Sequence, residues 1–367
     1  NDNGGCIYWS GIDGKMSNCN FTNINSDTSV QTYGYGSTVF WNGANGVVSD
    51  CNFINNTYTT SGSYSYGVFS FRASNFLLAN STFIGCRAVK SSYGGAVYVD
   101  GYGVISGCTF VNNSAGRGMA IETRTSLLTI RDSTFINHTG GDTVWLQSHN
   151  TVINCTFINN TASNGAAIYS YNMDNHIINS TFINNNVSSN GGAVYVHSSS
   201  GLSSVVNSIF ENNGANNGGA IYWNGNSGTL NDNTFTNNFA QGQSHDVYNA
   251  KGNLQITRNH FTAFYLDDIS DDNAITSSHN LKITAPNSNV TATMTITGTS
   301  SASDTFVVVA NSTGDINYYL PSLGVGNYNL RMSIESIDGN TYNVVNSVRF
   351  SVNVVLYDNL FVKWYLY

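Results

Sequence analysis

The amino-acid sequence predicts an all-β chain, with a parallel β-helix of about ten rungs followed by a small β-sandwich. Three observations lead to this expectation. The 367 residues include 36 Gly and 22 Tyr but only 2 Pro, and 9% are charged, which disfavours long helices. Two short phrases recur along roughly the first 260 residues. After them the pattern changes to alternating apolar and polar residues, which is typical of strands in a sandwich.

The repeat is marked by a phenylalanine that returns every 22 to 32 residues, with an aliphatic residue five positions before it in all ten copies. A unit of two or three short strands cannot bury an apolar face alone, whereas stacked units share one core. We therefore expect the phenylalanines to form a structural ladder. Its members are Phe21, Phe53, Phe83, Phe110, Phe135, Phe157, Phe182, Phe210, Phe235 and Phe261.

Asparagine stands two residues after this phenylalanine in eight of the ten copies. We expect its side chain to form a second ladder, with amides hydrogen-bonded from rung to rung as in other stacked β structures. The alternative is that asparagine only suits the turn after the strand. The fixed position favours the ladder, whose central members are Asn112, Asn137, Asn159 and Asn184.

An aliphatic residue directly follows the phenylalanine in six consecutive copies. Because side chains alternate across a strand, an inward phenylalanine turns these residues outward. We expect an apolar strip that forms an interface or lies beneath a flanking loop. This strip, a candidate binding surface, consists of Ile54, Ile84, Val111, Ile136, Ile158 and Ile183.

The other phrase, which reads GGAVY at Gly94 and AAIY at Ala166, places an aromatic residue in nine of the ten copies. Phe69, Trp145 and Tyr169 are assigned to this aromatic column. Alternation leaves both orientations open. A position in the core is favoured, whereas an outward position would provide a stripe suited to the faces of sugars. Trp145 and Tyr169 are therefore candidate binding residues.

The alternation of GGA[IV]Y with FxNN resembles the repeats of polymorphic outer-membrane proteins, and resembles still more closely the adhesin-like surface proteins of methanogenic archaea. The resemblance covers about residues 1–265. It implies a right-handed parallel β-helix, an extracellular cell-surface location, and partners that are cell-surface glycans or proteins, or sister subunits. Four copies depart from the Gly-rich phrase and are expected to bulge or to carry different loops; they lie at Tyr66, Met119, Asp142 and His245.

Four of the six cysteines share one position, two residues before the phenylalanine, where other copies have Ser or Asn. This distribution is typical of small core residues rather than of a disulfide framework or a metal site. We expect free, buried thiols and no cofactor. Eleven N-x-S/T sequons occur, about as many as chance predicts, so the family resemblance alone implies glycans. Candidate sites are Asn55, Asn112, Asn159 and Asn311.

The C-terminal part divides into three segments. Residues 266–280 are acidic and are expected to form a linker or cap. Residues 281–354 alternate strictly and predict a β-sandwich, and they resemble the immunoglobulin-like modules of the same surface proteins. Residues 355–367 are aromatic and predict either a final strand or a strand that pairs with a neighbouring subunit. Because residue 1 already lies inside a repeat, we expect a processed chain or a part of a longer one.

The net charge of −8, with 13 Lys and Arg that form no cluster, argues against nucleic-acid binding. No segment has the ~20 apolar residues of a membrane-spanning helix. Carboxylates suited to glycoside hydrolysis do not fall in neighbouring copies. The best catalytic candidates are Glu122 and Arg124 near Trp145, His149, Asp174 and His176, and a solvated Glu122–Arg124 pair is the alternative.

The predicted function is therefore that of a non-enzymatic, adhesin-like surface protein that attaches through the wall of its β-helix. Two alternatives remain. One is a structural subunit of a surface filament or sheath. The other is a β-helix polysaccharide lyase or hydrolase.

Overall fold

The structure is a computed structural model. It describes residues 5–28, 33–35, 38–60, 64–89, 92–124, 127–198, 201–243, 246–251, 254–257, 259–262, 289–298, 302–309, 315–319, 326–337, 340–352 and 361–365. The predicted acidic linker at 266–280 and the sequon at Asn311 lie outside these residues.

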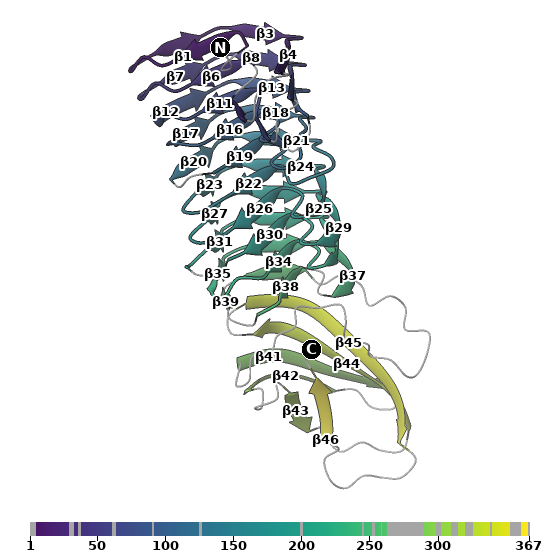
Figure 1. Ribbon diagram of the computed structural model, residues 1–367. Helices are drawn as coiled ribbons and strands as arrows, with labels where there is room; N and C mark the ends of the chain where they lie inside the picture. The colour runs from purple at the N-terminus through teal and green to yellow at the C-terminus, as the bar shows by residue number, and fades with distance from the viewer. Residues whose placement is uncertain are drawn as a thin grey trace.

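Up to Thr262 the described chain winds into a parallel β-helix (Figure 1). Three parallel ladders run along it, each with ten strands in the described residues, and one strand from each makes a rung. Ladder 1 carries the Gly-rich phrase. Its strands are β1 (Ile7–Trp9), β6 (Val39–Trp41), β11 (Phe69–Phe71), β16 (Val97–Val99), β19 (Ile121–Thr123), β22 (Val144–Leu146), β26 (Ile168–Tyr171), β30 (Val194–His197), β34 (Ile221–Trp223) and β38 (Val247–Asn249).

Ladder 2 carries the aliphatic residue and ladder 3 the phenylalanine. The strands of ladder 2 are β2 (Lys15–Ser17), β7 (Val47–Ser49), β12 (Ser74–Ala79), β17 (Tyr102–Ser106), β20 (Leu128–Arg131), β23 (Thr151–Ile153), β27 (His176–Ile178), β31 (Ser204–Val206), β35 (Gly228–Asn231) and β39 (Leu254–Thr257). Those of ladder 3 are β3 (Asn20–Thr22), β8 (Asn52–Ile54), β13 (Thr82–Ile84), β18 (Thr109–Val111), β21 (Thr134–Ile136), β24 (Thr156–Ile158), β28 (Thr181–Ile183), β32 (Ile209–Glu211), β36 (Thr234–Thr236) and β40 (His260–Thr262).

Shorter sheets lie in the connections from ladder 3 to the next rung. One contains β4 (Asn25–Thr28), β9 (Thr57–Thr60) and β14 (Arg87–Ala88), and another contains β25 (Thr161–Asn164), β29 (Asn186–Asn190), β33 (Gly214–Asn217) and β37 (Phe239–Gln243). The first three connections are the longest and contain a further sheet. We call this sheet the covering layer; its strands are β5 (Tyr33–Tyr35), β10 (Tyr64–Tyr66) and β15 (Ser92–Tyr93).

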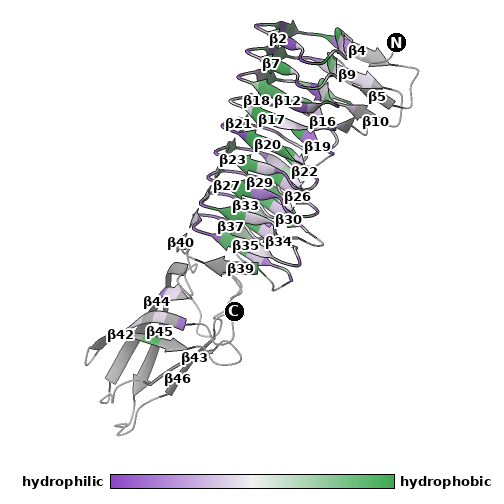
Figure 2. Ribbon diagram, turned by 90° about the vertical axis from the view of Figure 1, so that its left-hand side faces the viewer, coloured by the Kyte–Doolittle hydropathy of each residue, from purple (hydrophilic) through white to green (hydrophobic). Residues whose placement is uncertain are grey.

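The core of the β-helix is a column of stacked rings. From Phe21 to Phe235, each phenylalanine stacks on the next with ring centroids 4.5–5.1 Å apart. The rings are buried, and the aliphatic residues of ladder 2 pack beside them. Hydrophobic residues accordingly recur at the same positions in successive rungs (Figure 2). The predicted parallel β-helix and its phenylalanine ladder are confirmed.

The C-terminal described strands form antiparallel sheet. β45 (Asn340–Val352) continues ladder 3 by pairing in parallel with β40, and β44 (Gly326–Ile337), β41 (Asn289–Gly298) and β42 (Ala302–Val309) follow in antiparallel order. β43 (Asp315–Tyr319) and β46 (Phe361–Tyr365) pair with each other. The aromatic tail therefore contains a strand that pairs within its own chain.

Candidate functional site

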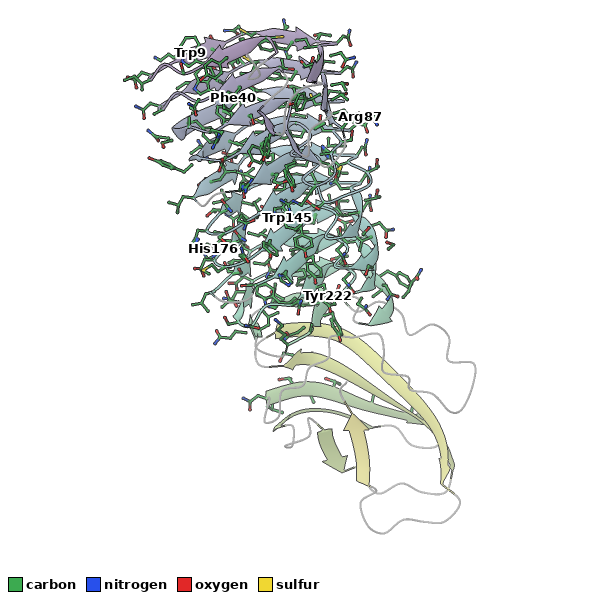
Figure 3. The ribbon with its side chains drawn as sticks, viewed as in Figure 1. Trp9, Phe40, Arg87, Trp145, His176 and Tyr222 are labelled. Carbon is green, nitrogen blue, oxygen red and sulfur yellow. The ribbon has the colours of Figure 1, made fainter. Side chains whose placement is uncertain are left out.

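The aromatic column lies on the outside of ladder 1. Val144 and Leu146 flank Trp145 and are fully buried, whereas Trp145 itself is half-buried. Phe40, Trp145 and Tyr222 all lie along this face (Figure 3). The favoured core orientation is therefore wrong, because both neighbours of the aromatic residue already point inward. In register, the column reads Tyr8, Phe40, Ser70, Tyr98, Glu122, Trp145, Tyr169, Tyr195, Tyr222 and Tyr248.

The third rung needs a second correction. Phe69 was assigned to the aromatic column, but it pairs in register with Val39 and Val97 and is buried in the core. Ser70 takes the column position and is also buried. Phe69 and Phe71 both face the core, so the only aromatic residues of this strand point inward and the outward position has no ring to mark it.

The column is open in rungs 6–10. Trp145 stacks on Tyr169 with centroids 4.2 Å apart, and the stack continues through Tyr195, Tyr222 and Tyr248 at 4.8–5.1 Å. All five rings are half-buried. Because each ring covers the face of the next, the column presents ring edges to solvent. A stripe of exposed faces for sugars, which was the expectation for an outward column, is not what this geometry provides.

The same column is covered in rungs 2–4. Phe40 is 3% exposed and Tyr98 is 1% exposed. Tyr66, from β10 of the covering layer, lies on Tyr98 with ring centroids 4.5 Å apart. The backbone carbonyl oxygen of Tyr66 also accepts a hydrogen bond from Ser70 Oγ at 3.3 Å. An outward position has thus become a second, smaller core.

Rung 5 separates the covered and open parts with an arginine–glutamate pair. Glu122 takes the column position, is 1% exposed, and pairs with Arg117. The Arg117 guanidinium lies 4.6 Å from the ring centroid of Tyr93 and 4.1 Å from that of Trp145, so that it fills the place of a ring. Burial raises the pKa of Glu122 to about 8, although Arg117 acts in the opposite direction. Burial likewise raises the pKa of Asp142 to about 6.

The apolar strip points outward, as its alternation with the buried phenylalanine predicts. Its six members pair in register from Ile54 to Ile183. All six are half-buried, and the strip ends at Glu211 in rung 8. The column before the phenylalanine is also outward and contains five consecutive threonines; these are Thr82, Thr109, Thr134, Thr156 and Thr181. Ladder 3 therefore offers an uncharged face in rungs 2–7.

The predicted asparagine ladder is displaced by one residue. Asn112, Asn137, Asn159 and Asn184 are exposed and adopt φ of 50–58°, which is the left-handed turn conformation that asparagine tolerates. This is the turn alternative. The next residue forms the ladder instead. Nδ2 of Asn160 donates to Asn185 Oδ1 at 2.9 Å, and the pattern continues at Asn213 and Asn238.

One member of this buried ladder is a histidine. His138 Nδ1 lies 3.0 Å from Asn160 Oδ1, and His138 Nε2 lies 3.2 Å from Asn113 Nδ2. A neutral ring with the proton on Nδ1 satisfies both contacts. Burial lowers the pKa of His138 to about 4. Rung 5 thus departs from the repeat at two positions, with Glu122 in the aromatic column and His138 in the asparagine ladder.

The cysteines and the sequon asparagines differ in their exposure to solvent. All six thiols are free; Cys51, Cys86, Cys108 and Cys155 are buried, whereas Cys19 is half-buried and Cys6 is exposed. The expectation of burial therefore fails for the two cysteines of rung 1. The sequon residues Asn55, Asn112 and Asn159 are exposed in left-handed turns, so their amides face solvent.

The catalytic candidates separate into distinct contacts. Glu122 pairs with Arg117 and not with Arg124, and it is buried rather than solvated. His149 Nε2 lies 3.3 Å from Asp174 Oδ2, and His176 Nδ1 lies 2.8 Å from Ser204 Oγ. Within the described residues, no three His, Cys, Asp or Glu side chains are placed to hold a metal ion. In the same part of the chain, no helix has the length and apolar character needed to cross a membrane.

Comparison with known proteins supports the repeat assignment. Residues 1–157 match the right-handed beta helix region family. Residues 154–171, 179–197 and 207–222 match the Chlamydia polymorphic membrane protein repeat. Searches of curated proteins and of solved structures returned no match. Up to Thr262 the described chain is therefore a right-handed parallel β-helix whose repeats are similar to those of polymorphic membrane proteins, and this similarity supports a surface-exposed, adhesin-like protein.

Proposed function

We propose that the protein is a non-enzymatic, adhesin-like protein of the extracellular cell surface, in which the β-helix is a stalk that attaches through its outer wall. One observation carries the proposal. Over a continuous buried core, the wall repeats two outward columns without charge, the open aromatic column in rungs 6–10 and the apolar strip in rungs 2–7. Uncharged faces of this length commonly mark interaction surfaces. The partners would be cell-surface glycans or proteins, or sister subunits.

We extend the proposal to the C-terminal strands. The sheet β42–β41–β44–β45 and the pair β43–β46 provide six antiparallel strands, which suits an immunoglobulin-like module. Such a module after a β-helix would place the chain among the adhesin-like surface proteins of methanogenic archaea. In that setting the exposed sequons at Asn55, Asn112 and Asn159 would carry glycans.

Attachment can be tested with the purified protein immobilised on beads. We expect the beads to be retained by an array of cell-surface glycans and proteins, and Ile136→Lys combined with Ile158→Lys to abolish retention or self-association. The matched control is Thr129→Lys with Thr151→Lys, which changes two half-buried outward residues of ladder 2 in the same two rungs. Unchanged retention and unchanged sedimentation of the isoleucine variant would exclude the apolar strip as an interface.

A filament or sheath subunit is the second candidate, and the length of the apolar strip favours it. Sister subunits that pack through this face would assemble in register, because both surfaces repeat at the ~4.8 Å strand spacing. Electron microscopy of the purified protein should then show ordered assemblies. Single particles at all concentrations would remove this candidate.

A polysaccharide lyase or hydrolase retains one observation in its favour, the raised pKa of Glu122 beside the aromatic column. Against it, Arg117 pairs with the carboxylate and only 1% of Glu122 is exposed. Incubation with a panel of polysaccharides decides the matter. New reducing ends that disappear with Glu122→Gln would establish an enzyme and overturn the proposed function.

A further inference from the structure

The structure itself shows what covers the aromatic column. In rungs 2–4 the cover is a set of extended strands that pair in parallel with one another, β5 with β10 and β10 with β15. Two of these strands have the sequence Tyr-x-Tyr. The described contacts of Tyr66 with Tyr98 and Ser70 show that a covering strand provides a ring for the column and a carbonyl oxygen for a nearby donor.

The covering layer ends at rung 5. A single bridge joins Tyr93 of β15 to Arg117, and the next connection, residues 137–143, is too short to add a strand. Arg117 lies between the rings of Tyr93 and Trp145, at the step from the covered to the open part of the column. The column continues past this step with the same ring stacking, and among the described strands the covering layer consists of β5, β10 and β15 alone.

Two polar atoms beside the open column have no partner. Trp145 Nε1 and His197 Nδ1 are buried and make no hydrogen bond within the described part of the chain. His197 stacks on Tyr171 with centroids 5.3 Å apart, and Tyr171 in turn lies 5.5 Å from Trp145. Both atoms lie too deep for a ligand on the outside to reach, so the candidate surface is the row of rings itself.

We propose that the open column binds one extended polypeptide strand with aromatic side chains at alternate positions, lying over Trp145 and Tyr169 and extending the covering layer beyond Arg117. Its rings continue the packing that Tyr66 makes on Tyr98. As in other modes of recognition of an extended peptide, alternate side chains would give the specificity. The inference rests on the proposed function, because it names the partner class for this part of the wall.

A polypeptide strand fits this surface better than a sugar chain. A sugar ring packs on the face of an aromatic ring, and here the faces of the inner rings are occupied by their neighbours at 4.2–5.1 Å. What remains is a row of ring edges, to which aromatic side chains pack well in edge-to-face geometry.

The test uses the whole protein and a labelled, end-capped peptide of residues 61–68, SGSYSYGV, which contains strand β10. The control peptide has serine in place of both tyrosines. In fluorescence anisotropy, we expect the tyrosine peptide to bind at least tenfold more tightly than the control. Tyr169→Ser should weaken binding at least tenfold, whereas Tyr102→Ser, an exposed tyrosine outside the column, should leave it unchanged.

Tyr169→Phe serves as a second variant in case Tyr169→Ser disturbs the fold, and it should retain binding because it keeps the ring. Equal binding of the two peptides, equal binding by Tyr169→Ser, or no binding at millimolar peptide would overturn the inference. So would displacement of the peptide by a soluble oligosaccharide that itself requires Tyr169.

The result that would contradict the proposed function differs from the result that would contradict the inference. If the wild-type protein attaches to surfaces but does not prefer the tyrosine peptide, the inference is wrong and the proposed function stands. If the wild-type protein attaches to no surface, the proposed function is wrong, and the peptide experiment still decides the inference.

Discussion

Rungs 2–4 and rungs 6–10 carry the same outward column but place it in different environments. In the first region Phe40 and Tyr98 are buried beneath the covering layer, whereas in the second Tyr169 and Tyr195 are half-buried. The strands of ladder 1 pair in register throughout, so the strands do not account for the difference. The connections do, because residues 23–38, 55–68 and 85–96 are long enough to fold back over the wall and later connections are not. Whether an aromatic residue is core or surface is decided here by a loop.

The largest expected effect comes from truncating one ring in each region. Tyr98→Ala should lower the free energy of unfolding by about 3–5 kcal/mol, as for other buried aromatic residues, because it empties a site enclosed on both sides. Tyr195→Ala removes a ring that solvent already reaches, so we expect about 1 kcal/mol. Urea unfolding followed by circular dichroism measures both. Equal losses would mean that the cover contributes no packing.

The histidine of rung 5, at the border of the two regions, should make the protein sensitive to acid. Because its folded pKa is about 4 and so lies below the ordinary value of 6.5, the neutral ring contributes stability above pH 6.5 that is lost as the pH falls toward 4. His138→Asn restores the amide found in neighbouring rungs. The variant should therefore be more stable than wild type at pH 4.5, by about 2 kcal/mol, and similar to it at pH 7. A wild-type advantage at pH 4.5 would show that the ring is not held neutral.

Two buried carboxyl groups at this border, Glu122 in rung 5 and Asp142 in the connection to rung 6, should make the protein less stable as the pH rises. Their pKa values are raised by burial, to about 8 for Glu122 and about 6 for Asp142. A raised folded pKa contributes stability at low pH that is lost as the pH rises through it. Between pH 6.5 and 8.5 the free energy of unfolding should fall, and Glu122→Gln should remove about 1–2 kcal/mol of that fall. Unchanged pH dependence in the variant would place the titration elsewhere, for example at Asp246, whose pKa burial raises to about 7.

Substitutions at the left-handed turns should have the smallest effect, and the same effect in both regions. Asn55 and Asn159 hold left-handed turns, with φ of 52° and 56°, on opposite sides of rung 5. A β-branched side chain is strained in the left-handed conformation. Asn55→Val and Asn159→Val should therefore each lower the free energy of unfolding by about 1 kcal/mol. The glycine variants should be nearly neutral. Unequal costs would show that the covering layer also supports the turns.

Much of the fold followed from spacing alone. The phenylalanine, its outward isoleucine neighbour and the paired aliphatic residue stand at fixed intervals, so the members of each column could be named, as with Phe110 and Ile136. The direction in which the aromatic column points was harder to predict. In Val144-Trp145-Leu146 all three residues are apolar, so neither face reads as polar. The long connections that cover Tyr98 gave no periodic signal.

The asparagine ladder was misplaced for a related reason. In Asn159-Asn160 the first residue turns the chain and the second is buried, but both have the same side chain. A signal existed, because the second position also accepts Cys86 and His138, which are residues of an interior rather than of a turn. The Arg117–Glu122 pair was missed because Arg117 belongs to a connection, and its distance from the column follows only from the folded loop.

The hydrogen bonds of the three ladders all run from rung to rung, and this has a mechanical consequence. Tension between the two ends is carried by these bonds one rung after another, so the rung at the weaker end opens first while the others stay closed. Each rung that opens replaces a rise of ~4.8 Å with a free length of about 80 Å, from roughly 25 residues at ~3.3 Å each. A molecule built in this way yields stepwise under a pull, and in the proposed role of a stalk it would lengthen under brief shear before it detached.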